Sequence, residues 1–81
     1  MSGIDDAIET FKEAAAALAT VRKKYPDMLI EITIEEHGPR VHATLGSAGL
    51  DRSVPWTYLQ HAHANVLAIS VGDVARALVN R

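Results

Sequence analysis

The chain has 81 residues and no cysteine, and 48% of its residues are hydrophobic while 22% are charged. This composition is typical of a folded globular domain, and a chain this short buries only about 60–65% of its unfolded surface, enough for one core. The missing cysteines exclude disulfides, thiol nucleophiles and cysteine-based metal sites. A net charge of −2 has the wrong sign for a broad DNA-binding protein and is too small for a nucleic-acid mimic.

We therefore expect one α+β domain over residues 1–81, a two-layer αββαα arrangement in which an antiparallel β-hairpin packs on helices. No apolar run approaches the ~20 residues that cross a bilayer. Asp5 and Asp6 stand where a secretory signal would carry bases. These features predict a cytoplasmic protein without a membrane partner.

Residues 2–24 are predicted to form the first helix. Ser2 is suited to cap its start, three basic residues complement the dipole at its end, and Pro26 stops it. Apolar residues at helical spacing form one stripe, which consists of Ile4, Ala7, Ile8, Phe11, Ala14, Ala15, Leu18, Val21 and Tyr25. We expect this stripe to cover the hairpin, and its seven-residue spacing leaves an additional subunit contact or a coiled coil open as alternatives.

The hairpin is predicted over residues 28–45, because apolar and polar residues alternate on both sides of His37-Gly38-Pro39. The apolar side, expected beneath the helices, consists of Ile30, Ile32, Ile34, Val41, Ala43 and Leu45. Gly38 supplies a backbone that adopts positive φ. A loop over residues 36–39 keeps the apolar side intact and pairs Glu35 with Arg40, Ile34 with Val41, Ile32 with Ala43 and Ile30 with Leu45.

Residues 46–52, read as Gly-Ser-Ala-Gly-Leu-Asp-Arg, are predicted to be a flexible connector by composition. A glycine-rich loop after a strand also cradles phosphate when a helix follows at once. This segment lacks the lysine and hydroxyl residue of a P-loop, and Pro55 delays the next helix. We therefore predict no phosphate site here.

A second helix is predicted from Ser53, which serves as its cap, to about Ile69. Trp56 falls on its apolar stripe and is expected in the core, whereas Tyr58 points about 200° away and is expected to be exposed. The alternative for residues 66–71 is a strand, because a short apolar run fits both structures.

A third, short helix is predicted over residues 70–79, with an apolar face made of Val71, Val74, Ala75 and Leu78. Residues 70–78 also resemble the first helix of the helix-turn-helix in MerR-like regulators, in which a recognition helix follows. Only three residues follow Leu78, so we favour a simple capped helix.

The sequence contains no motif for metal, cofactor or catalytic chemistry. Its four histidines include His61 and His63, which point in different directions on a helix and converge on one ion only if that segment is extended. Neither a nucleophile elbow nor a zinc-protease motif is present, and the carboxylates are spread out. We therefore expect a non-catalytic protein without a cofactor.

The remaining candidate is the polar side of the hairpin, which nothing in the predicted fold covers. We predict a partner-binding surface that consists of Glu31, Thr33, Glu35, Arg40, His42, Thr44 and, on the second helix, Tyr58. The partner is expected to be another protein, and a homodimer through a strand edge is a further option.

The predicted function is a small inhibitor or adaptor that occludes a partner's surface. Stand-alone domains of this size are often of this type, and phage-encoded inhibitors of bacterial defence, including anti-CRISPR proteins, are examples. The alternative is a nucleic-acid-associated accessory or regulatory protein, which would use Arg40, Arg52, Arg76 and Arg81.

Overall fold

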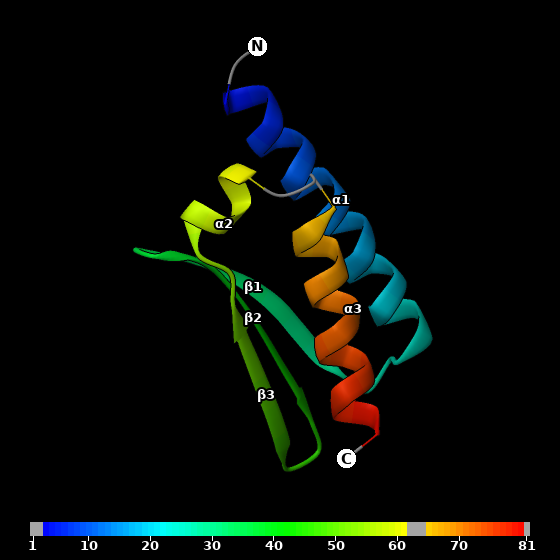
Figure 1. The fold of residues 1–81 in the computed structure, drawn as a ribbon. Helices are drawn as coiled ribbons and strands as arrows, with labels where there is room; N and C mark the ends of the chain where they lie inside the picture. The colour runs from blue at the N-terminus through cyan, green and yellow to red at the C-terminus, as the bar shows by residue number, and fades with distance from the viewer. Residues whose placement is uncertain (1–2, 62–64, 81) are drawn as a thin grey trace.

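A long helix, a three-stranded sheet and two further helices follow one another along the chain (Figure 1). The computed structural model describes residues 3–61 and 65–80, and the side chains of residues 8–59 and 65–80. The elements are α1 (Gly3–Lys24), β1 (Leu29–Glu35), β2 (Gly38–Leu45), β3 (Ala48–Ser53), α2 (Trp56–His61) and α3 (Val66–Val79). The predicted α+β fold, with an antiparallel hairpin on helices, is confirmed.

The sheet contains a third strand where the sequence predicted a connector. β3 pairs antiparallel with β2 in the order β1-β2-β3, so the loop prediction for residues 46–52 is wrong. Gly46, at a φ of 63°, and Ser47 form the turn that joins the two strands. Ala48 and Leu50 extend the apolar side of the hairpin. Because Gly49 and Ser53 occupy the other side, the segment has the composition of a loop and its strand-like alternation is difficult to recognise from the sequence.

The hairpin between β1 and β2 has a shorter loop than predicted. Its turn consists of residues 36–37, and Ile34 lies opposite Pro39 while Ile32 lies opposite Val41. The predicted register is therefore wrong by two residues. Because two residues is one full period of a strand, every side chain nevertheless stays on its predicted side.

Gly38 explains why the loop is short. The segment that follows β3 crosses this turn, with Val54 N–H donating to the Pro39 carbonyl and Trp56 N–H donating to the His37 carbonyl, both at 2.9 Å. Gly38 has a φ of 144°, and a Cβ atom there would lie 2.1 Å from the Val54 carbonyl oxygen. Only glycine permits both the backbone angle and this approach.

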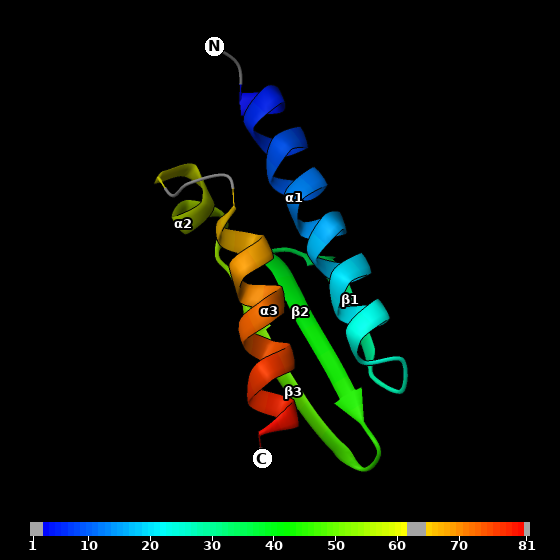
Figure 2. The same ribbon diagram turned by 90° about the vertical axis from the view of Figure 1, so that its right-hand side faces the viewer.

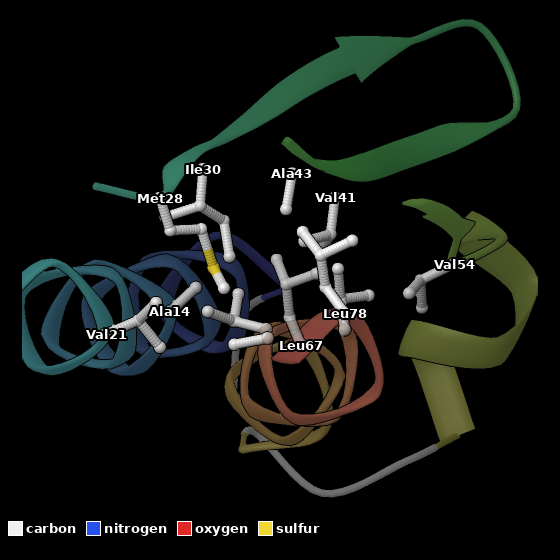
Figure 3. Packing of buried hydrophobic residues seen from close by; sticks show 12 residues of the cluster. Ala14, Val21, Met28, Ile30, Val41, Ala43, Val54, Leu67 and Leu78 are labelled. Atoms are coloured by element: carbon white, nitrogen blue, oxygen red, sulfur yellow. The ribbon is translucent and has the colours of Figure 1, made fainter. Parts of the chain in front are cut away.

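The helices α1 and α3 lie side by side on one face of the sheet (Figure 2, Figure 3). Thr10, Ala14 and Val21 form the buried stripe of α1, which packs mainly on α3 and less on β1. The apolar core consists of Ala14, Val21, Met28, Ile30, Val41, Ala43, Val54, Leu67, Val71, Val74, Ala75 and Leu78. The predicted apolar face of residues 70–79 is therefore confirmed.

The C-terminal helices differ in extent from the prediction. The expected helix from Ser53 to Ile69 is wrong, because Ser53 ends β3, α2 starts at Trp56 and the turn residue Asn65 precedes α3. The alternative strand at residues 66–71 is also wrong. Leu67, Val71, Val74 and Leu78 lie on one stripe at spacings of four and three, which joins the two predicted pieces into one helix.

Trp56 and Ile34 lie outside the core, although the sequence predicted both of them inside it. Trp56 is half-buried, and its indole N–H donates to the Glu36 carbonyl at 3.1 Å, which attaches α2 to the first turn of the sheet. Ile34 is 62% exposed because β1 continues past the part that α1 covers. Ile30 is buried as predicted, and Ile32 is half-buried.

Candidate protein-binding surface

The face of the sheet that points away from α1 and α3, called here the outer face, is not covered by any described element (Figure 3). Six predicted site residues lie on it. Glu31, Thr33 and Glu35 of β1 are exposed, and Arg40, His42 and Thr44 of β2 are half-buried. The structure thus brings together six of the seven predicted residues, because alternate residues of paired strands share a face.

Charged and polar side chains form a connected group across the three strands. The Arg40 guanidinium lies 3.2 Å from a Glu35 carboxylate oxygen and 4.0 Å from a carboxylate oxygen of Asp51. The His42 ring nitrogen Nδ1 also contacts Asp51, which lies directly opposite on β3. Exposed ion pairs of this kind contribute about 0–1 kcal/mol each, so a partner can replace them at little cost.

Glu31 differs from the other acidic residues of this face. It lies opposite His42 in the ladder but has no ion pair among the described residues. Glu35, by contrast, accepts from both Arg40 and the Thr33 hydroxyl, the latter at 3.3 Å. The Glu31 carboxylate is therefore the acidic group most available to a partner's cation.

Two residues of the outer face were missed from the sequence. Asp51 was assigned to the connector, because the glycine and serine around it conceal the strand. Leu29 is 74% exposed beside Thr44, and its odd number, shared with Glu31 and Thr33, already indicated the outer face. An open groove of about 630 Å³ runs past it, lined by Arg22, Pro26, Met28, Leu29, Ile30, Glu31, His42 and Thr44.

Tyr58 belongs to a different surface. It is 56% exposed on α2 and lines a groove of about 340 Å³ between the end of β3, α2 and α3. That groove also contains Ile69 and Asp73 but none of the other six predicted residues. The structure therefore separates Tyr58 from the outer face.

Three of the four arginines considered for nucleic-acid binding are paired with carboxylates. Arg40 lies between Glu35 and Asp51, while Arg52 and Arg76 both contact Asp73, Arg52 at 3.4 Å. Arg81 lies outside the described residues. The arginines thus do not form a continuous row of free cations in the described part of the chain, which is the arrangement that a phosphate backbone requires.

Among the side chains that the structure describes, those of residues 8–59 and 65–80, no group of three or more histidine, aspartate or glutamate residues could hold a metal ion. The side chains of His61 and His63 lie outside the described set, so the geometry of that pair stays a prediction. No helix among the described residues is both long enough and apolar enough to cross a membrane.

Comparison with known protein families, with curated proteins and with solved structures found no match. The function is therefore argued from the geometry of this chain.

Proposed function

We propose that the protein is a non-catalytic binding domain that attaches to another protein through the outer face. The observation that supports this proposal is the uncovered sheet face with its exposed, exchangeable ion pairs around Arg40. A sheet needs cover on one face only, so the polar residues there are free to meet a partner. An inhibitor or adaptor that works by occlusion needs no more chemistry than such a surface.

The inhibitor version, comparable to the phage proteins that block bacterial defence, follows from size and the absence of a catalytic motif. It extends the proposal from binding to occlusion. The nucleic-acid alternative is less well supported, because Arg40, Arg52 and Arg76 are already paired with carboxylates. The two versions differ in salt dependence, since binding to a phosphate backbone weakens steeply between low and physiological salt.

The test is affinity capture with the tagged full chain from the source cell, followed by mass spectrometry. Thr33→Arg places a long cation on the outer face in the middle of β1, and Thr20→Arg makes the same change on an exposed site of α1. We expect the partner to be retained by the wild-type chain and by Thr20→Arg, and lost with Thr33→Arg. Circular dichroism of both variants verifies that each is folded.

Equal retention by both variants would place the interface elsewhere on the molecule. A wild-type chain that retains nothing above the background of an untagged control would contradict the binding proposal itself. Retention of nucleic acid that disappears at physiological salt would favour the alternative function.

A further inference from the structure

The outer edge of β1 carries backbone groups that are directed away from the sheet. The Pro39 carbonyl accepts from Val54, so odd-numbered residues of β2 bond to β3 and even-numbered ones bond to β1. The even-numbered residues of β2 lie opposite odd-numbered residues of β1. The groups that point outward are therefore those of Ile30, Ile32 and Ile34.

Only the first of these three positions is capped. The Arg22 guanidinium of α1 donates to the Ile30 carbonyl at 2.9 Å, which confirms the outward direction of that group. The outward groups of Ile32 and Ile34 have no partner among the described residues. An edge left open in this way is a template for another strand, and proteins normally block such edges.

The two sides of this edge have opposite character. On the helix side, Leu18, Ala15, Phe11 and Ile8 precede Arg22 by 4, 7, 11 and 14 residues, which places them on the same flank of α1. Ile8 is 54% exposed and Phe11 and Leu18 are half-buried, while Ile34 is 62% exposed at the end of β1 that α1 does not cover. A strand added beside Ile32 and Ile34 would meet their apolar side chains on this side.

On the outer side, the same strand would lie beside the exposed carboxylates of Glu31 and Glu35.

The outer face by itself is small for a protein interface. Three strands about 4.8 Å apart and some seven residues long cover roughly 300 Å² in projection, whereas a stable interface buries about 800 Å² per partner. A partner therefore needs to contact surface next to the sheet as well.

We propose that the edge of β1 at Ile32 and Ile34 accepts an extended segment of a partner protein in which apolar and basic residues alternate. The segment adds a fourth strand, with its apolar side chains beside those of Ile32 and Ile34 and its cations beside Glu31 and Glu35. This inference rests on the proposed binding function and names the chemistry of the partner. A second copy paired antiparallel about Thr33 would set Glu31 opposite Glu35 of the copy, an unfavourable contact between like charges that a basic partner avoids.

The probe is a capped nine-residue peptide of alternating valine and lysine, titrated into the isotope-labelled full chain. We expect the amide protons of Ile32 and Ile34 to shift and to become protected from solvent exchange. A valine–glutamate peptide and a peptide of the same composition with its valines and lysines in two blocks are expected to bind at least several-fold more weakly. Equal binding of all three peptides would overturn the proposal.

Two variants separate the charge from the edge. Glu31→Lys is expected to lower the affinity of the valine–lysine peptide roughly two- to tenfold and to raise the affinity of the valine–glutamate peptide. Glu13→Lys, the same change on the far flank of α1, is expected to alter neither affinity. Ile34→Pro removes one outward N–H group without touching the bonds to β2, as proline on an edge strand permits, and is expected to abolish binding.

The outcomes also distinguish this inference from the proposed function. If the peptide fails to protect Ile32 and Ile34 while Thr33→Arg still loses the captured partner, the edge inference is wrong and the outer-face proposal stands. Protection of Ile32 and Ile34 that rises with protein concentration in the absence of peptide would assign the edge to a second copy and overturn the inference.

Discussion

Replacement of Gly38 by alanine tests the contact that joins the hairpin to the segment after β3. The Cβ atom of the variant would lie 2.1 Å from the Val54 carbonyl oxygen and 3.0 Å from both Pro55 Cα and Trp56 N. All three neighbours are backbone atoms, so no side-chain rotation relieves the overlap. The backbone must move, and the bonds from Val54 to Pro39 and from Trp56 to the preceding turn are the first to lengthen.

Two effects lower the free energy of unfolding of the Gly38→Ala variant. A φ of 144° is nearly restricted to glycine, and forcing another residue there costs about 1–3 kcal/mol. Overpacking a closed contact costs a further ~1–3 kcal/mol. The expected loss of about 2–6 kcal/mol is a large fraction of the ~4–12 kcal/mol typical for a chain of this length. The Tm should fall by about 10 °C or more.

The assay is urea denaturation followed by circular dichroism at 222 nm, since the single tryptophan, Trp56, lies too close to the change to serve as a neutral probe. Gly46→Ala is the matched control. Gly46 also has positive φ, 63°, but nothing lies within 4 Å of its Cβ position, so only the backbone cost of about 1–2 kcal/mol applies. If the two variants lose the same stability within about 0.5 kcal/mol, the close approach at Gly38 does not matter and the reasoning is refuted.

Three further predictions concern the core and the surface. Leu67→Ala should lower the free energy of unfolding, measured with denaturant, by about 2–5 kcal/mol, because Leu67 is fully buried. Ile34→Ala should change it by less than about 0.5 kcal/mol, because Ile34 is largely exposed. Similar losses for the two variants would contradict the observed cover of β1. Ala14→Leu should cost about 1–3 kcal/mol by crowding α1 against α3, while Ala15→Leu on the exposed flank should leave the Tm unchanged; equal Tm values would refute this packing. Asp73→Asn should lower the free energy of unfolding by at most about 1 kcal/mol, and this difference should vanish in 1 M salt. A larger or salt-independent loss would show that the ion pairs of Asp73 with Arg52 and Arg76 contribute more than exposed pairs do.

Most of the candidate surface could be predicted from the sequence, because the alternation of side chains along a strand is a local property. Glu31, Thr33 and the four other hairpin residues share a face in both the predicted and the observed register, since an error of two residues moves no side chain to the other side. Tyr58 was grouped with them for its exposure alone, and its position depended on where α2 begins. Asp51 required knowledge of the third strand.

The periodicity of the chain by itself determined the fold class, the faces of the hairpin and the apolar face of residues 70–79. Each of these follows from the regular direction of side chains along a helix or a strand. Tertiary structure decided the third strand, because Ala48 and Leu50 become strand residues only when they can pair with β2 and add to a shared core. It also decided the register at Gly38, where the approach of Val54 from a distant part of the chain selects the shorter turn. Contacts between distant segments depend on how the elements pack together, and no local pattern contains that information.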